Sequence, residues 1–430
     1  MAQEHSEALG SDSRLATSVG TAVEAGQLGR PAARILMLVP SPPPLGGVEA
    51  AYQMLLPHLG GEFNDLTVCS SSVRLTNFSR GKFDWAGVAA TVRMLVRLWK
   101  ALVFFRPDAI LMTLSISPTG LMKEGAAIAL ARLWGSQVVV HYHQGELLAR
   151  VLTGGSWWLR AWLKALLSQV RFVLVLGEGI GKALVEAGMD SRRVRVLHNC
   201  IDLDAVTPKD WGAAEAHNEV RLVFLGDVSF RKGFPDLADA LAVVREKNPS
   251  VVLVVAGEVV PPAAESFLRR DFLTPDVQLR FDRAGDRIRE ALEAGASAGI
   301  CYMGSVRGEH KWQLLRDSDV LVLPSYAEGL PMSILEAMAT GLAVIATSVG
   351  AVTDAVIDGE TGYVVPPGGV ALLADRLGKL AADVHLRRRM GEAGRHRIER
   401  VFSGPVVGTR FGSLMREAAA RARPPQRKVW

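Results

Sequence analysis

Two glutamates in one short segment have the type and spacing to bind hydroxyl groups. Glu328 and Glu336 are separated by seven residues, with Pro324 before them, Pro331 between them and Gly341 after them. This order predicts a buried strand that ends near Pro324, a short loop, and a helix that begins near Pro331 and ends near Gly341. A helix start favours phosphate, and ionised carboxylates accept hydrogen bonds from hydroxyls. The pattern indicates a pocket for a nucleotide sugar, although either glutamate taken alone fits a simple complement to the helix dipole.

A longer string of residues places this segment in a known pattern. Its members are Pro324-Ser325, Glu328-Gly329, Pro331, Glu336-Ala337-Met338-Ala339, Gly341, Val344-Ile345-Ala346-Thr347, Asp358-Gly359, Thr361-Gly362 and Val365-Pro366. The string resembles the donor-site motif of the retaining glycosyltransferases of family 4, a family with the GT-B fold that includes polysaccharide-assembling members. The resemblance implies that Glu328 binds hydroxyls of the transferred sugar and that Glu336 binds the ribose. Gly329 and Leu330 are further donor-binding candidates beside Glu328.

A pair of cations stands after an apolar run at 223–225, in Arg231-Lys232-Gly233. Such a pair suits a diphosphate, whose charge must be neutralised as a glycosidic bond breaks, although an isolated surface pair is usually just solvated. In the family the element reads G-R-x4-K-G, and both cations contact the diphosphate. Lys232 and Gly233 match this pattern, but Asp227 occupies the arginine position. Our hypothesis is that Arg231 supplies the missing charge.

Two elements of the first half are further candidates. Gly46 and Gly47 precede a helix predicted to begin near Val48, and glycines let the backbone approach a ligand closely, although a plain turn uses the same residues. His141 and His143 end a predicted strand, where a histidine is more often structural than catalytic. The resemblance implies that the glycine loop closes over the donor phosphates and that a histidine at this strand end lies near the transferred sugar. We predict this role for His143, with His141 as the second candidate.

Strand-like and helical runs alternate along the chain, which predicts an α/β protein with parallel, doubly wound sheets. The predicted strands are 35–39, 109–113, 137–141, 172–176, 195–198, 220–225, 251–256, 277–281, 320–324, 343–347 and 363–365. Predicted helices include 48–58, 85–105, 157–170 and 234–247. The series divides at a polar stretch, 202–218. We therefore expect the GT-B architecture, two Rossmann-like domains that face each other across a cleft.

The expected domain boundaries follow from this division. They are a flexible tail at 1–33, an N-terminal acceptor domain at 34–204, a C-terminal nucleotide-sugar donor domain at 205–400, and a crossover helix with a basic tail at 401–430. The helix, near 408–421, is expected to brace the first domain.

Composition narrows the class of protein. A chain of 430 residues, 49% of them apolar, can bury two or three domain cores. The three cysteines lie far apart without metal-ligand spacing, which favours reduced thiols and a cytoplasmic location. The net charge of +5 is too small to indicate nucleic acid. No cofactor is implied, because the nucleotide sugar would be a substrate. No metal is expected either, because cations together with a helix dipole suffice for a diphosphate.

Two stretches of the first half are basic and free of acidic residues. Residues 86–106 carry four cations, and residues 147–177 carry four more together with Trp157, Trp158 and Trp162. Basic helices with aromatic residues suit an anionic membrane surface, whereas ordinary packing with solvated cations explains them equally well. A lipid-linked acceptor would favour the membrane, at the inner face of the cell membrane.

The sequence leaves three functional hypotheses. The first is a retaining, metal-independent glycosyltransferase that moves a sugar from a nucleotide-diphospho-sugar to a hydroxyl acceptor, a lipid-linked or polysaccharide precursor. The second is a GT-B pseudoenzyme subunit that binds sugar nucleotides, motivated by Asp227. A sugar-nucleotide epimerase of the same fold is the third, and the family 4 pattern of the second half disfavours it.

Overall fold

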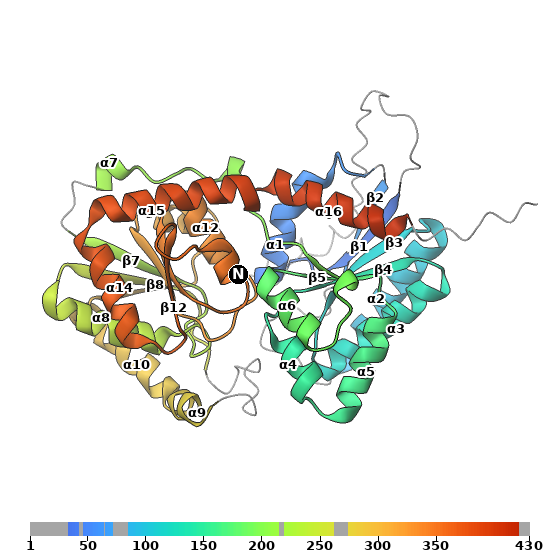
Figure 1. The fold of residues 1–430 in the computed structure, drawn as a ribbon, viewed down its shortest axis with the longest axis horizontal. Helices are drawn as coiled ribbons and strands as arrows, with labels where there is room; N and C mark the ends of the chain where they lie inside the picture. The colour runs from blue at the N-terminus through green and yellow to red at the C-terminus, as the bar shows by residue number, and fades with distance from the viewer. Residues whose placement is uncertain are drawn as a thin grey trace, which may run out of the picture. The chain divides into compact units, whose positions relative to one another are not determined.

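Two parallel sheets of six strands each form the framework of the protein (Figure 1). The computed structural model describes residues 33–42, 46–63, 65–71, 85–214, 219–261 and 274–420. Most of the predicted N-terminal tail, and all of the basic tail at 421–430, lie outside the described residues. Helices cover both faces of each sheet, so the predicted α/β class with two Rossmann-like halves is confirmed.

The first sheet has the strand order β2-β1-β3-β4-β5-β6. Its strands are β1 (Arg34–Val39), β2 (Asp65–Ser70), β3 (Ala109–Leu114), β4 (Gln137–Tyr142), β5 (Phe172–Val175) and β6 (Val194–Val196). β2 was not predicted. It is an edge strand with no fully buried residue, so its sequence lacks the apolar run by which the central strands were recognised.

Side chains of β1 alternate between two apolar layers, as a strand covered on both faces requires. Leu36 and Leu38 face the apolar layer to which α2 (Trp85–Phe104), α3 (Pro118–Leu133), α4 (Leu147–Gly154), α5 (Trp157–Ser168) and α6 (Glu178–Glu186) contribute buried side chains. Ile35 and Met37 face the opposite layer, which α1 (Gly47–Leu55), the short helix η1 (Leu56–Leu59) and α16 (Gly404–Ala419) form. The helices of the first half therefore divide between the two faces of its sheet.

The second sheet has the order β12-β11-β10-β7-β8-β9. Its strands are β7 (Val220–Leu225), β8 (Val251–Ala256), β9 (Ile300–Gly304), β10 (Val320–Leu323), β11 (Ala343–Thr347) and β12 (Gly362–Val365). Its main helices are α8 (Phe234–Lys247), α9 (Pro275–Asp282), α10 (Ala284–Ala294), α11 (Glu309–Arg316), α12 (Met332–Thr340), α14 (Val370–Ala382) and α15 (Val384–Arg397). β9 was missed for the same reason as β2, because three of its five residues are exposed.

The strand predicted at 277–281 is wrong, because these residues belong to α9. Val277, Leu279 and Phe281 alternate with polar residues as in a strand, but Pro275 begins a helix. Val277 and Phe281 then share one helix face and pack against Phe230, whereas Leu279 is 53% exposed. Short alternating runs of apolar and polar residues are compatible with a strand or a helix, and here the proline at the helix start favours the helix.

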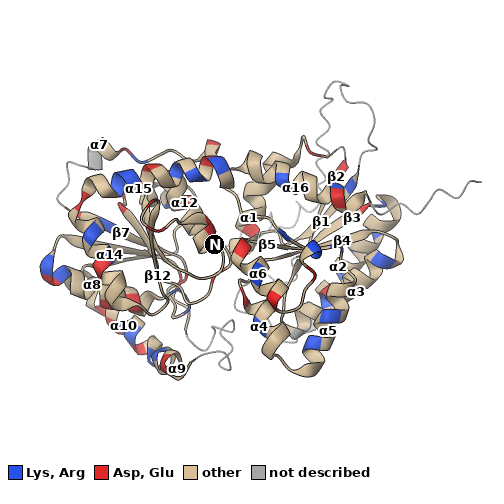
Figure 2. Ribbon diagram, in the orientation of Figure 1, with Lys and Arg blue, Asp and Glu red and all other residues tan. Residues whose placement is uncertain are grey.

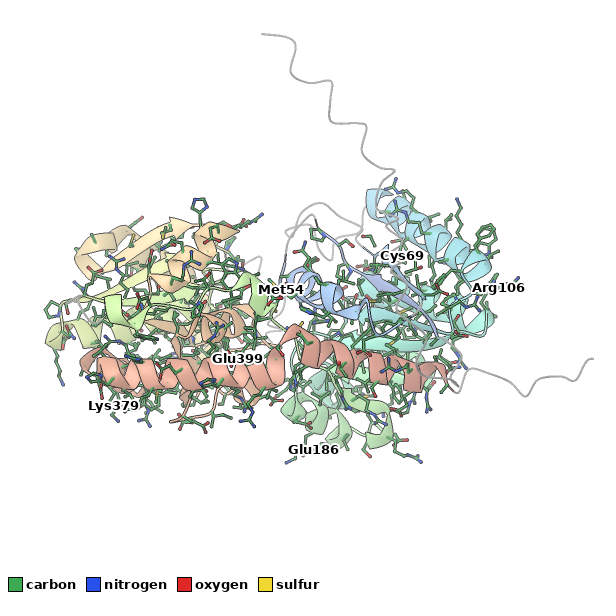
Figure 3. The ribbon with its side chains drawn as sticks, turned by 90° about the horizontal axis from the view of Figure 1, so that it is seen from above. Met54, Cys69, Arg106, Glu186, Lys379 and Glu399 are labelled. Carbon is green, nitrogen blue, oxygen red and sulfur yellow. The ribbon has the colours of Figure 1, made fainter. Side chains whose placement is uncertain are left out.

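The last helix, α16, packs on the first sheet although it follows the second one in the chain. Phe411 and Met415 are fully buried in the same cluster as Ile35 and Met37 of β1. The chain reaches this position beside Ile201, which forms an isolated parallel bridge with Ser403. Figure 3 shows α15 and α16 following one another end to end. A bracing helix was expected at 408–421, and α16 begins four residues earlier.

None of the helices in the described part of the chain has the length and apolarity to cross a membrane.

Candidate active site

The loop between β10 and α12 carries the first candidate, Glu328. Pro331 occupies the position before α12, and Gly341 ends the helix in the left-handed conformation with φ 90°, as predicted. Neighbouring segments hold the loop. Thr347 donates from its hydroxyl to the Ser325 carbonyl over 2.5 Å, and Ala351 donates from its backbone N–H to the Gly329 carbonyl over 2.7 Å. The Glu328 carboxylate is thus presented from a fixed backbone at the carboxyl edge of the second sheet.

Lys232, Arg231 and Glu328 form one charged cluster, defined here as the donor cluster. Lys232 Nζ donates to Glu328 Oε1 over 2.6 Å, and Arg231 Nη1 lies 3.9 Å from Glu328 Oε2. The hydroxyl of Ser325 donates to the same Oε1 over 2.7 Å. Burial alone would raise the pKa of Glu328, but the two cations and these hydrogen bonds outweigh it and lower the pKa below its usual value. Glu328 is therefore an ionised, hydrogen-bond-accepting carboxylate.

Arg231 lies beside Lys232 and Glu328, and its role as the missing cation stays a prediction. Its guanidinium also lies 3.4 Å from Asp227 Oδ2 and donates to the Ala327 carbonyl over 3.4 Å. The side chain of Asp227 is 53% exposed, whereas that of Arg231 is 20% exposed. The cation is thus partly countered by the residue that replaces the family's arginine.

Glu336 is buried on α12 and is paired with a cation that the sequence analysis did not single out. Lys311 Nζ on α11 donates to Glu336 Oε1 over 2.7 Å, and Glu336 is 4% exposed. Because a buried carboxylate requires a cation or hydrogen-bond donor, a partner for Glu336 could have been expected from the sequence. The partner itself is 25 residues away and belongs to another helix, so no local pattern identified it.

His141 and His143 lie on the same face of the β4 end, and Tyr52 of α1 bridges them. The Tyr52 hydroxyl is 3.1 Å from His141 Nδ1 and 3.4 Å from His143 Nε2. Burial lowers the pKa of His141 to about 4 and the pKa of His143 well below its usual value, so both rings are neutral at pH 7. Tyr52 was missed because it reads as an ordinary apolar position of α1.

Close backbone approaches bring the β4 end to the Glu328 loop. A Cβ atom at Gly329 would collide with the carbonyl oxygen of His143, and one at Gly145 would collide with the carbonyl oxygen of Glu328. Asn199 Nδ2 also donates to the Leu330 carbonyl over 2.8 Å. The structure therefore brings His143 together with the Glu328-Gly329-Leu330 loop, although these residues come from the two different sheets.

Gly46 and Gly47 lie at the start of α1, as predicted. Gly46 occupies the position before the helix, and Gly47 is its first residue. A Cβ atom at Gly47 would have no neighbour within 4 Å, so packing does not require a glycine there. The same helix, α1, carries Tyr52 about one and a half turns further on, and Tyr52 contacts His141. The preceding residues 43–45 lie outside the described part of the chain.

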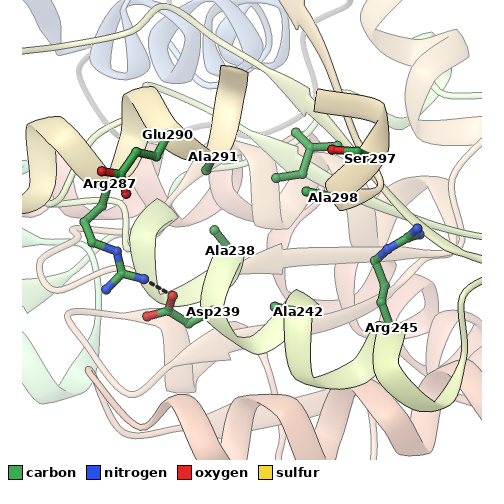
Figure 4. A pocket seen from close by; sticks show the side chains of 10 residues that line it. Ala238, Asp239, Ala242, Arg245, Arg287, Glu290, Ala291, Ser297 and Ala298 are labelled. Carbon is green, nitrogen blue, oxygen red and sulfur yellow. Dashed lines mark hydrogen bonds and ion pairs between the residues drawn. The ribbon is translucent and has the colours of Figure 1, made fainter. Parts of the chain in front are cut away.

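Among the described residues, no group of three or more His, Cys, Asp and Glu side chains is arranged to hold a metal ion. A surface hollow of about 420 Å³ lies between α8 and α10, where Asp239 pairs with Arg287 (Figure 4). None of the candidate site residues lines this hollow, and its two arginines, Arg245 and Arg287, are already paired.

Comparisons with known proteins agree with the fold and the motifs. Residues 208–397 match the family model for glycosyl transferases group 1, and residues 46–200 match the glycosyl transferase 4-like domain. The D-inositol 3-phosphate glycosyltransferase of Nocardia farcinica is 32% identical over 219 residues, which are 49% of this chain and 45% of that protein. The chain spans about half the length of the curated relatives that it matches.

Solved structures extend the likeness over most of the chain. Sucrose-phosphate synthase from Thermosynechococcus elongatus superposes with a TM-score of 0.70 at 19% identity, over 90% of this chain and 99% of that one. HepE of Anabaena in complex with UDP-glucose gives a TM-score of 0.63 at 15% identity, over 90% of this chain and 100% of that one. Fold and motifs together define a GT-B glycosyltransferase. The chain belongs to the GT4-type glycosyltransferases, as the sequence resemblance implied.

Proposed function

We propose that this protein is a retaining glycosyltransferase that takes a sugar from a nucleotide-diphospho-sugar. The observation that carries the proposal is the donor cluster, in which Lys232 contacts a buried, ionised Glu328 over 2.6 Å with Arg231 beside it. An ammonium group has three N–H donors, so Lys232 can contact Glu328 and diphosphate oxygens together. HepE, which shares the fold, was solved with UDP-glucose, and this supports a donor of the same chemical class.

The residues divide the work of the reaction between them. Glu328 accepts hydrogen bonds from hydroxyls of the transferred sugar, and Glu336, fixed by Lys311, binds the ribose. Lys232 and Arg231 stabilise the negative charge that grows on the diphosphate as its bond to the anomeric carbon breaks. The glycine loop at Gly46 and Gly47 closes over the phosphates. No metal ion is needed in this scheme, because the two cations and the start of α12 carry the charge.

The acceptor reacts from the side of the first sheet. Its hydroxyl oxygen bonds to the anomeric carbon on the face from which the diphosphate leaves. The bonding electrons depart with the diphosphate oxygen, and that leaving group takes the hydroxyl proton. His143, neutral and in contact with Tyr52, lies beside the Glu328 loop and orients the sugar and the acceptor. Because the new bond forms on the face that the diphosphate leaves, the anomeric configuration is retained without a bond between a side chain and the sugar.

The acceptor is a lipid-linked or polysaccharide precursor, and a lipid-linked one would place the reaction at the inner face of the cell membrane. A second candidate function is a pseudoenzyme subunit that binds the donor and leaves chemistry to a partner. The contact between Arg231 and Asp227 favours this candidate, because it reduces the charge available to the diphosphate. The pair of Lys232 with Glu328 favours catalysis.

A donor screen distinguishes the two functions. UDP-, GDP- and ADP-sugars are added to the protein, and the shift of its unfolding temperature reports binding by mass action. The best donor is then incubated with lipid-linked and oligosaccharide acceptors, with and without EDTA, and the product anomer is determined by NMR. Turnover with a retained anomer and no loss in EDTA is expected. Protection without turnover would favour the pseudoenzyme, and an inverted anomer or no protection by any donor would refute the proposal.

A further inference from the structure

The outer surface of α2, α3, α4 and α5, named here the basic face, combines positive charge with exposed apolar side chains. Among the residues of these helices, the single carboxylate in the sequence is that of Glu124, and it is 6% exposed. The cations on the same helices are Arg93, Arg97, Lys100, Lys123, Arg132, Arg150, Arg160 and Lys164. Figure 2 shows blue segments on α2, α3 and α5.

Large apolar side chains are exposed between these cations. They are Val92, Val96, Trp99, Phe104, Met122, Leu133, Trp157 and Trp158, and Trp134 directly after α3. The most exposed are Phe104 at 81%, Leu133 at 80% and Trp157 at 75%. These are half of all exposed large apolar residues found among the described residues. Apolar exposure concentrated on one face marks an interaction surface rather than ordinary surface composition.

The helices that carry these residues form one continuous layer. α2 packs against α3, and α4 packs against α5. α3 in turn contacts α5, because a Cβ atom at Gly125 would lie 3.5 Å from Leu166 and 3.8 Å from Trp162. Trp162 therefore packs inward on α3, and the membrane expectation does not hold for its side chain. Trp157 and Trp158, one turn earlier, remain at the surface.

We propose that the basic face binds the surface of an anionic lipid bilayer. Cations attract the headgroup charge, and exposed tryptophan, phenylalanine and leucine side chains enter the boundary between headgroups and acyl chains. A second copy of this chain is a poor occupant, because it would bring a second set of cations against the first. Nucleic acid offers anionic charge, but exposed aliphatic side chains such as Leu133 and Met122 gain little from a phosphate backbone. The proposal does not depend on the proposed catalytic function.

Vesicle sedimentation of the full chain tests the proposal. Vesicles of phosphatidylcholine with one part in three phosphatidylglycerol are compared with vesicles of phosphatidylcholine alone, at low and at high salt. We expect sedimentation with the anionic vesicles, and release at 1 M salt, where the screening length falls to about 3 Å. A wild-type protein that stays in the supernatant with anionic vesicles at low salt overturns the proposal. So does retention of duplex DNA without sedimentation of vesicles.

Charge reversals locate the contact. Two matched pairs, each four residues apart on one helix, are Arg160→Glu with Lys164→Glu on α5 and Arg93→Glu with Arg97→Glu on α2. Each pair should weaken vesicle binding by at least about tenfold, because each nearby cation contributes substantially to attraction. The control pair reverses two exposed cations on other helices, Arg389→Glu on α15 and Arg410→Glu on α16. Equal loss in the control and the α5 pair would show a net-charge effect and overturn the assignment.

A second readout follows the apolar contact. Brominated lipids quench tryptophan fluorescence at short range, so wild-type fluorescence should fall when anionic brominated vesicles are added. The double variant Trp157→Ser with Trp158→Ser should lose the part of this quenching that comes from α5, while its thermal unfolding and donor protection stay unchanged. Because both residues are exposed, the variant should fold. Quenching that remains at the wild-type level would remove α5 from the contact.

Discussion

At the scale of single residues, Lys232 is where charge stabilisation should have its largest effect. Its ammonium group contacts Glu328 over 2.6 Å. Gly233, the residue between Lys232 and α8, has the left-handed backbone conformation with φ 73°. Lys232→Ala should lower turnover by about 10²–10³, the usual effect of removing one preorganised charge in a transition state. The measurement is turnover beside thermal unfolding. Turnover equal to that of the wild type would remove Lys232 from the mechanism, whereas a large stability loss would make its role structural.

Arg231 and Asp227 test whether a neighbouring cation compensates for the missing one. If Arg231 contacts the diphosphate, Arg231→Ala should be nearly as damaging to turnover as Lys232→Ala. Asp227→Ala should be mild, or should raise turnover slightly, because it frees the guanidinium from its contact at 3.4 Å. Turnover and donor protection are measured for both variants. Full activity of Arg231→Ala would contradict the hypothesis that Arg231 compensates for Asp227.

The buried ring of His141 predicts a pH dependence of stability. The pKa of His141 is lowered from its usual 6.5 to about 4 by burial, so between these values the unfolded state binds the proton and the folded state does not. Stability should therefore fall as pH decreases through this window, by at most about 1.4 kcal/mol per pH unit for one such group. His141→Phe should flatten the slope of unfolding free energy against pH between 4 and 6.5. An unchanged slope would mean that this ring is protonated in the folded protein.

At the scale of elements, Gly329 is where two loops approach most closely. A Cβ atom there would collide with the His143 carbonyl, so Gly329→Ala should separate the β4 end from the Glu328 loop. We expect turnover to fall at least about tenfold, because small misplacements of reacting groups are costly. Gly378→Ala in α14 is the matched control, since its Cβ would meet no atom within 4 Å and alanine favours a helix. Equal turnover of the two variants would contradict the close approach.

The same elements show what local sequence could predict. The loop and helix from Pro324 to Gly341 were predicted because a proline, a glycine and an apolar run each act within a few residues. β2 and β9 were missed because their exposed positions carry no such signal. Lys311 and Tyr52 were missed because each acts on a residue that only tertiary folding brings close, 25 and 89 residues away. Chemistry carried by one segment is readable from the sequence, whereas residues of separate segments, such as Lys232 and Glu328, were assigned to one site only through the family resemblance.

At the scale of the whole chain, α16 joins the end of the sequence to the first sheet. Phe411 is fully buried there among side chains of β1, and Arg416 Nη1 pairs with Glu62 Oε2 over 2.8 Å at its outer side. Gly412 allows this packing, because a Cβ atom would collide with the Glu62 side chain. The first sheet is therefore completed by a helix more than 200 residues beyond its last strand, and the stability of one half depends on the continuity of the chain through the other.

Phe411→Ala tests this dependence. The substitution removes a buried ring and should cost about 3–5 kcal/mol of unfolding free energy, since the surrounding apolar side chains close only part of the cavity. Val406→Ala on the same helix is the control, because Val406 is 44% exposed and should change stability by less than about 0.5 kcal/mol. Denaturant unfolding of both variants is followed by circular dichroism and tryptophan fluorescence. If α16 completes the core around the first sheet, the half of the chain that contains this sheet should unfold first in Phe411→Ala, before the half that contains the second sheet. Tryptophan fluorescence should report this early transition, because the first half carries most of the tryptophans. A single transition at the wild-type midpoint would show that the first sheet is stable without the contribution of this helix.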